Sequence, residues 1–137
     1  MRKQIIVLTL VAASLVLATS GLAAGGKSSS SITLVMSGSS TFSASSIAEP
    51  TYGDHVTFDL VTTADRPYVT VNCYQGANWV YAAQAGFWAS YGPGQDFNLA
   101  ASSWPGGAAD CTATLGVLNS DGTKFRELAT TTFHVDA

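Results

Sequence analysis

The sequence predicts an all-β fold, an antiparallel β-sandwich of about seven strands stapled by one disulfide. After residue 30 the chain consists of short runs of β-forming residues in which apolar and polar side chains alternate, and no stretch shows sustained helical periodicity. All four prolines and an Asp-Gly pair fall between these runs, where they turn the chain without breaking a strand ladder. Short strands with one apolar face each bury those faces by packing as two sheets.

The first residues predict export. Arg2 and Lys3 precede a nearly uninterrupted apolar run over residues 5–18, and the small residues of 21–23 follow, which is the three-part form of a secretory signal peptide. The apolar run is shorter than the about 20 residues of a membrane-spanning helix. An uncleaved N-terminal anchor is the alternative. We expect a signal peptide over residues 1–23, a flexible Gly- and Ser-rich lead-in over 24–30 and one β-sandwich domain over 31–137.

Three strands are expected in the first half of this domain. The first begins at residues 31–36, "SITLVM", and continues past a Ser-Gly break into residues 41–45, "TFSAS". The second covers residues 55–62, "HVTFDLVT". The third covers residues 68–75, "YVTVNCYQ", in which Val69, Val71 and Cys73 alternate with polar residues and therefore share one face.

Four further strands complete the prediction. They cover residues 79–87, "WVYAAQAGF", 96–101, "DFNLAA", 110–118, "DCTATLGVL", and 125–135, "FRELATTTFHV". Asp121-Gly122 predicts a hairpin turn between the last two, because glycine accepts a positive φ. The segment 119–122 also faintly resembles a calcium loop, but it lacks the bidentate glutamate that such a loop needs.

The order, length and spacing of these strands resemble a bacterial immunoglobulin-like (Ig-like) domain. The resemblance covers residues 31–137 and is strongest in "GGAADCTATL" and the final hairpin, which are similar to the F and G strands of such domains. Two features depart from the antibody pattern: the first cysteine lies on the third run, and Ala109 stands at the tyrosine-corner position before Cys111. The resemblance implies an extracellular binding or structural role without catalysis.

Cys73 and Cys111 are predicted to form a disulfide. Each lies on the apolar parity of its run, the chain holds two cysteines, and export places them in an oxidising compartment. In the Ig-like order the third and sixth strands are antiparallel neighbours, so the resemblance implies a bridge within one sheet and not between the sheets. Directly opposed residues there lie about 4.5–5.5 Å apart, which a disulfide accepts. The alternatives are two buried free thiols, or a reactive or metal-binding thiol.

The charge of the chain restricts its partners. Without Arg2 and Lys3, four basic residues remain against nine acidic ones, which is a net charge of −5. An acidic surface without basic clusters argues against nucleic acid and against anionic membranes as partners. We expect a soluble, secreted, extracellular monomer that binds a protein or a glycan, does not insert into a membrane, and uses no cofactor or metal.

Aromatic residues that follow the third run are the best functional clue. Trp79, Tyr81, Phe87, Trp88 and Tyr91 lie close together in the sequence. Phe87 and Trp88 are adjacent, so both cannot face inward from an extended strand. Exposed rings near a loop stack on sugars or anchor a protein partner. The alternative is that these rings cover one end of the core.

No sequence motif predicts catalysis. The chain contains no Ser-nucleophile elbow, HExxH, P-loop or GxGxxG motif. The leading prediction is an exported, non-catalytic Ig-like module that binds through loops or a sheet edge, or serves a structural role. The alternative is a stand-alone carbohydrate-binding domain that uses the exposed aromatics. A small secreted hydrolase is a third class, for which no paired nucleophile and base can be named.

Overall fold

The structure is a computed structural model that describes residues 29–37, 49–91 and 95–137, and these residues contain seven strands. The predicted signal peptide (1–23), residues 24–28 of the lead-in and the expected strand piece 41–45 lie outside the described residues. In the parts described, no helix is long and apolar enough to cross a membrane.

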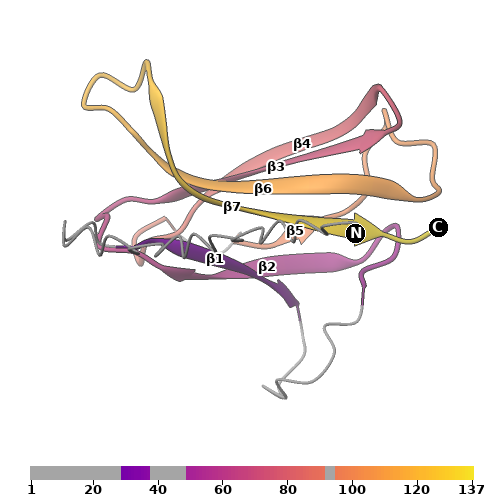
Figure 1. Cartoon of the computed structure of the whole chain (residues 1–137), viewed down its shortest axis with the longest axis horizontal. Coiled ribbons are helices and arrows are strands. Elements are labelled where there is room, and N and C mark those ends of the chain that lie inside the picture. Colours follow the sequence, from indigo (N-terminus) through magenta and orange to yellow (C-terminus); the bar gives the residue numbers. More distant parts are fainter. Residues whose placement is uncertain (1–28, 38–48, 92–94) are drawn as a thin grey trace, which may run out of the picture.

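The strands follow the predicted runs closely. They are β1 (Ser31–Met36), β2 (His55–Val61), β3 (Tyr68–Gln75), β4 (Asn78–Gly86), β5 (Phe97–Asn98), β6 (Ala109–Leu118) and β7 (Phe125–Val135) (Figure 1). The run 96–101 was expected to be a full strand, but only Phe97–Asn98 pairs. Its ladder stops because the Ala100 N–H donates to the Asn98 carbonyl at 2.8 Å and turns the chain.

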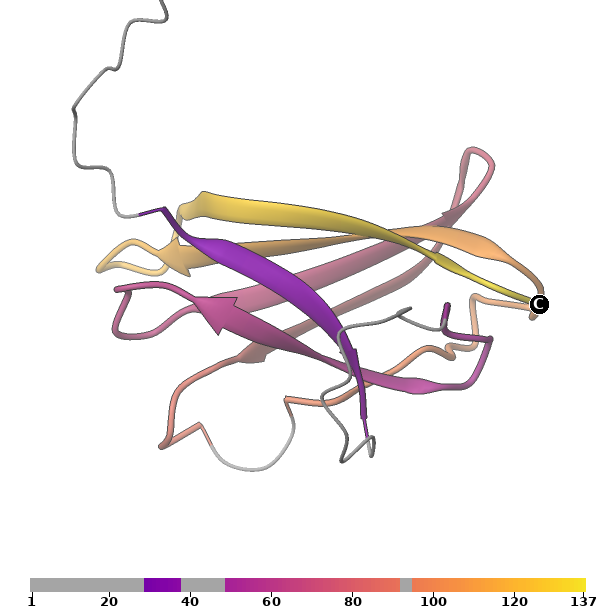
Figure 2. The ribbon, with the colours of Figure 1, turned by 60° about the horizontal axis from the view of Figure 1, so that its bottom comes forward.

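The strands form two sheets that pack face to face. One has the order β1-β2-β5 and the other β4-β3-β6-β7, and every neighbouring pair is antiparallel. Figure 1 shows the sheets as two layers, and Figure 2 shows β1 and β2 in front of the four-stranded sheet. The predicted β-sandwich is confirmed. The strand order is also that of Ig-like sandwiches, with β1, β2 and β5 in the places of A, B and E and the other sheet in those of C′, C, F and G.

The core lies between the two sheets and is made by every second residue of their strands. Val56 and Phe58 of β2 face Val71 of β3 and Leu115 of β6 across it, and all four are buried. Trp104, from the loop before β6, closes one end and is 2% exposed. Among the described residues no polar or charged side chain is buried, so apolar burial is the main non-covalent stabilisation of the interior.

The disulfide joins Cys73 of β3 to Cys111 of β6 inside the four-stranded sheet. The two residues are direct partners in the antiparallel register, with Cα atoms 4.1 Å apart. This is near the about 4.5 Å of a narrow antiparallel pair. Both side chains point into the core and are 0% and 2% exposed. The predicted bridge within one sheet is confirmed, and the free-thiol alternatives are wrong.

The β6–β7 hairpin closes through the predicted turn. Gly122 has a φ of 72°, and the Asn119 N–H donates to the Lys124 carbonyl at 2.9 Å. The Asp121 carboxylate accepts hydrogen bonds from the hydroxyl and the N–H of Thr123, which hold the pKa of Asp121 below its usual value. The carboxylate thus braces the turn, and the segment forms the predicted hairpin.

Candidate functional site

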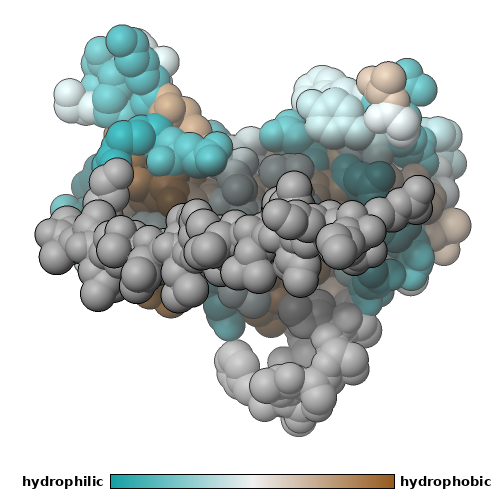
Figure 3. Space-filling model, viewed as in Figure 1, coloured by the Kyte–Doolittle hydropathy of each residue, from teal (hydrophilic) through white to brown (hydrophobic). Residues whose placement is uncertain are grey.

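The side of the four-stranded sheet that faces away from the sandwich is here called the outer face. Its side chains alternate with core residues along each strand, as Tyr68, Thr70, Asn72 and Tyr74 do on β3. The β3–β4 and β6–β7 hairpins both rise on this side, at opposite ends of the sheet (Figure 1). The space-filling view shows the molecule hollowed between these two raised ends (Figure 3). The outer face is therefore a concave surface that no other element of the described chain covers.

Two rows of uncharged side chains cross the middle of the outer face, and they are called the polar rows below. One row is Gln84, Thr70, Thr114 and Thr130, and the other is Ala82, Asn72, Thr112 and Thr132, in the order β4-β3-β6-β7. In the first row the Gln84 amide donates to the Thr70 hydroxyl at 2.9 Å. The four threonines of β6 and β7 have side chains with no hydrogen-bond partner among the described residues. The rows therefore offer several free hydroxyl groups, each a donor and an acceptor.

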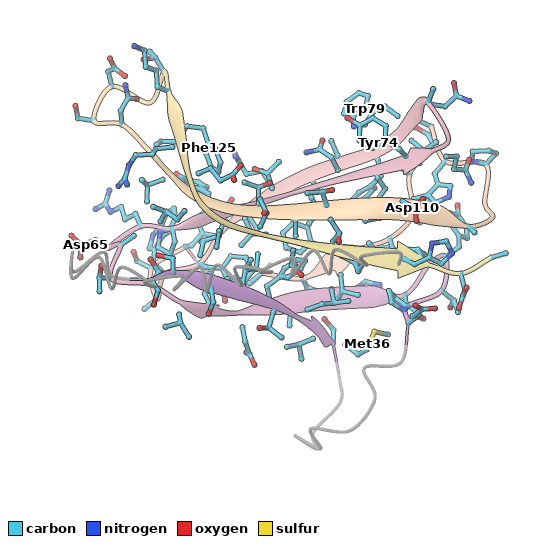
Figure 4. All side chains as sticks on the ribbon, in the orientation of Figure 1. Met36, Asp65, Tyr74, Trp79, Asp110 and Phe125 are labelled. Carbon is cyan, nitrogen blue, oxygen red and sulfur yellow. A yellow bond between two sulfur atoms is a disulfide. The ribbon has the colours of Figure 1, made fainter. Side chains whose placement is uncertain are left out.

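Tyr74 and Trp79 form one aromatic end of the outer face. They are partners across β3 and β4, and they are 43% and 58% exposed. The indole N–H of Trp79 donates to the Asn72 side-chain oxygen at 3.2 Å, which fixes the edge of the ring and leaves much of it open to solvent. Figure 4 shows both rings together on the side of the sheet that faces away from β1 and β2.

Tyr81, expected with Trp79 in the exposed cluster, is instead buried. Residues two apart on a regular strand share a face, but the register shifts between Cys73 and Tyr74, so that Cys73 pairs with Tyr81 and Tyr74 with Trp79. This β-bulge turns Tyr81 inward, where it is 7% exposed and its ring centroid lies 6.1 Å from that of Trp104. Burial also raises the pKa of Tyr81. The residue belongs to the core and not to the site.

Trp88 forms the opposite aromatic end, together with Tyr68 and Tyr91. The ring of Trp88 lies 5.0 Å from that of Tyr68 and 4.8 Å from that of Tyr91, edge to face in both cases. Trp88 covers Gly86 of β4, where any Cβ would overlap the indole ring. The glycine thus lets an aromatic side chain lie flat against the strand. Tyr91 is 42% exposed and completes this end.

Phe125, the first residue of β7, extends the same end across the sheet. Its ring covers Gly116 of β6, where a Cβ would overlap it, and the side chain is 38% exposed. Gly86, Tyr68 and Gly116 are partners across β4, β3 and β6. Figure 4 shows Phe125 and the pair Tyr74 and Trp79 at opposite ends of the outer face. The polar rows lie between these two aromatic ends.

Phe87 takes the other direction from its neighbour Trp88. It is half-buried against the core, and its ring stacks on that of Phe97 at 6.3 Å and 14°. Alternation along an extended chain thus splits the adjacent pair, as the sequence predicted. Of the five aromatic candidates, Trp79, Trp88 and Tyr91 lie on the outer face. Trp79 is separated from the other two by the polar rows.

The sequence did not identify Tyr68, Tyr74, Phe125 or the polar rows as site residues. Tyr68 and Tyr74 stand on the polar parity of their run, which marks solvent-facing positions but not a binding surface. The threonines of β6 and β7 line up with Thr70 and Asn72 of β3 only through strand register. The usable signal is the repeated threonine of residues 112–114, where Ala113 marks the buried face, and of residues 130–132, where all three are threonine.

One ion pair borders the aromatic end at Tyr74. Asp110 is the partner of Tyr74 across β3 and β6, and His134 is the partner of Asp110 across β6 and β7. His134 Nδ1 lies 2.8 Å from Asp110 Oδ1, and because a carboxylate only accepts, the ring N–H donates. This hydrogen bond raises the pKa of His134, with a further contribution from the Asp136 carboxylate. The charges stand at the margin and leave the polar rows neutral.

Other parts of the described chain bring fewer functional groups together. A hollow of about 310 Å³ opens between the edge strands β1 and β7, lined by both apolar residues such as Ile32 and Phe133 and polar ones such as Glu49 and His134. In the described residues, no three His, Cys, Asp or Glu side chains are grouped so that they could hold a metal ion. Ser37 and His55 both hydrogen-bond to the Asp96 carboxylate, which joins the end of β1 to the start of β2.

Comparisons of the chain with protein-family models, with curated proteins and with solved structures found no match. The distribution of exposed apolar side chains carries the functional argument instead. Of the six large apolar side chains that are exposed in the described residues, Tyr74, Trp79, Tyr91 and Phe125 belong to the outer face. Such a concentration on one face is typical of an interaction surface.

Proposed function

We propose that this protein is an exported, non-catalytic binding module of the Ig-like type, and that it binds its partner with the outer face of β4-β3-β6-β7. The observation that carries the proposal is a concave sheet face that no other element of the described residues covers, with an aromatic group at each end. Exposed Trp and Tyr side chains are typical anchors of binding sites. The strand order supports the Ig-like assignment.

The disulfide supports export. A bridge between two buried cysteines forms and persists in an oxidising compartment, and such bridges are rare in the cytosol of mesophiles. Together with the predicted signal peptide over residues 1–23, this favours a protein that works outside the cytoplasm.

The arrangement of Ser37, Asp96 and His55 supports a role without catalysis. These are the residue types of a hydrolytic triad, but here the aspartate stands between the other two and accepts a hydrogen bond from each. In a working triad the histidine contacts the serine hydroxyl and takes its proton. His55 is bonded to Asp96 and not to Ser37, and these contacts join the end of β1 to the start of β2, which favours a structural role for the group.

The geometry favours the sheet face over the loops and edges that the sequence suggested as binding elements. Side chains on hydrogen-bonded strands are held more firmly than side chains on loops, so a partner meets a preorganised surface. The disulfide lies beneath this face, one residue from Asn72 and from Thr112, and further restrains it.

The test is a binding screen with a variant that blocks the face. Immobilised extracellular proteins and a glycan array are probed with the oxidised wild-type protein, with Thr114→Arg and with Thr33→Arg. Thr114 lies in the polar rows, whereas Thr33 is exposed on β1 of the other sheet, so it is the matched control. We expect Thr114→Arg to weaken the wild-type interaction at least about tenfold and Thr33→Arg to leave it unchanged. Equal binding by all three proteins would refute the assignment of the face.

A further inference from the structure

We infer that the ligand of the outer face is a neutral, extended polysaccharide that lies lengthwise along the strands, over the polar rows and between the two aromatic ends. This inference rests on the proposed function, and it adds the chemical class and the direction of the ligand. It follows from the charge of the face, the position of its aromatic rings and its length.

The middle of the outer face carries no charge. All eight residues of the polar rows are neutral, and their groups are hydroxyls and amides apart from Ala82. The titratable side chains closest in register stand beside the two ends, the Asp110–His134 pair at one and Glu127 at the other. A neutral floor with carboxylates at both margins suits an uncharged polymer and disfavours a polyanion such as an acidic glycan or a nucleic acid.

Hydroxyl and amide side chains match the groups that line the edges of a sugar ring. A pyranose carries hydroxyl groups around its rim, and each of them can donate and accept a hydrogen bond. The free threonine hydroxyls of β6 and β7 can do the same. Asn72 and Gln84 add amide groups on β3 and β4, already oriented by hydrogen bonds to Trp79 and Thr70. These contacts fix the orientation of the ligand, directly or through water.

Aromatic rings match the faces of sugar rings, which are rich in C–H groups. Trp79 is held at its edge by Asn72, with 58% of its surface exposed. At the far end Trp88 is held over Gly86 by its contacts with Tyr68 and Tyr91. Because these rings are positioned before binding, stacking a sugar on them costs little side-chain entropy.

The layout is the reverse of a protein–protein interface. Such an interface has an apolar, aromatic centre and a polar rim, and its energetically dominant residues gather at the centre. Here the centre is polar and hydroxyl-rich, and Tyr74, Trp79, Trp88 and Tyr91 stand at the ends. A folded protein partner would bury the threonine rows without apolar contact at its centre. A chain of sugars uses the whole surface.

The length of the face requires an oligomer. Tyr68 and Tyr74 are six residues apart on β3, which at about 3.4 Å per residue places the two aromatic ends about 20 Å apart. A hexasaccharide is long enough to reach both ends, whereas a disaccharide reaches one. Affinity should therefore rise with chain length until both ends are occupied, because the second contact is then intramolecular.

The experiment is calorimetric titration of the oxidised protein with defined oligosaccharides. The neutral probes are hexasaccharides of glucose, xylose, mannose and N-acetylglucosamine with β- and α-linkages, together with the matching disaccharides, and the charged probe is hexagalacturonate. We expect at least one neutral hexasaccharide to bind about tenfold or more tightly than its disaccharide. Hexagalacturonate should bind more weakly than that hexasaccharide.

Matched variants locate the binding on the outer face. Trp79→Ala and Trp88→Ala should each weaken hexasaccharide binding about tenfold, since each removes one stacking end. Val61→Ala, at the most exposed large apolar side chain outside this face (65%), should leave binding unchanged. Trp79→Ala changes an exposed ring and should fold normally, so it decides the outcome if Trp88→Ala is unstable.

Two results overturn the inference. The first is that no neutral hexasaccharide binds, or that hexagalacturonate binds as tightly as the best of them, while Thr114→Arg still abolishes an interaction with a protein partner. In that case the proposed binding face stands and the proposed ligand class is wrong. The other is that no interaction of any kind responds to Thr114→Arg, which removes the proposed function together with the inference.

Discussion

The disulfide between Cys73 and Cys111 should contribute about 4 kcal/mol to the free energy of unfolding. The two residues are 38 apart in sequence, so the bond closes a loop of that length in the unfolded chain. The chain-entropy relation for such a loop gives about 13 cal/mol/K, or about 4 kcal/mol at 25 °C. Against about 5–15 kcal/mol for a whole domain, this decides whether the sandwich stays folded.

The perturbation is the double variant Cys73→Ala and Cys111→Ala, which removes the bond without leaving a buried thiol. Because both side chains are almost completely buried, the small cavities add to the loss and do not reduce it. The melting temperature should fall by about 15–25 °C, since about 4 kcal/mol is lost from a domain of roughly 100 residues. The dependence of unfolding free energy on urea should steepen, because the unfolded chain without the bond exposes more surface.

Urea unfolding of the oxidised wild type and the double variant, followed by tryptophan fluorescence, to which the buried Trp104 contributes, measures this difference. The single variant Cys73→Ala is a control that also removes the bond and should match the double variant to within about 1 kcal/mol. A stability difference below about 1 kcal/mol between wild type and double variant would refute the reasoning, since chain entropy alone predicts several times more.

Three further predictions follow from the described side chains. Tyr81→Ala should lower the free energy of unfolding by about 3–5 kcal/mol because it leaves a cavity in the core, whereas Trp79→Ala should lower it by less than about 1 kcal/mol. Equal losses for the two variants in urea unfolding would contradict the β-bulge that turns Tyr81 inward. His134 should titrate above its ordinary pKa of 6.5 in an NMR pH series, and Asp110→Asn should lower that pKa. The interaction with Asp110 stabilises the fold fully below the ordinary pKa, and this stabilisation is lost as the pH rises through the folded-state pKa. An unchanged His134 pKa in Asp110→Asn would argue against the ion pair. Gly86→Ala should displace the indole ring that covers it and change the near-ultraviolet circular dichroism with the strand signal retained, and an unchanged spectrum would show that the ring does not pack there.

Local alternation was sufficient to predict most of the strands, and the disulfide was predicted from the same alternation together with the resemblance that makes the third and sixth strands neighbours. Cys73 and Cys111 lie on the apolar parity of their runs, and parity alone orients them to the core. The run 96–101 was predicted too long, since a local turn between Asn98 and Ala100 ends its ladder. Alternation of apolar and polar side chains continues through this turn, so it does not report where the strand pairing ends.

The site was predicted only in part because it depends on strand register. Trp79 and Tyr81 share a parity, and only the bulge opposite Cys73 and Tyr74 separates them into surface and core. The polar rows come from four strands, and the threonines of β7 meet Thr70 only through the order β3-β6-β7. No window of sequence contains these neighbours together.

The measurement that tests the central claim most directly is an NMR titration of the oxidised, nitrogen-15-labelled protein with the neutral hexasaccharide that binds best. If the outer face is the binding surface, amide shifts will concentrate on β3, β4 and β6 around Asn72 and Thr114 and on the indole N–H of Trp79. The residues of β1 and β2 will be unaffected. Shifts confined to the loops or to the three-stranded sheet, or none at all at saturating ligand, would contradict the account.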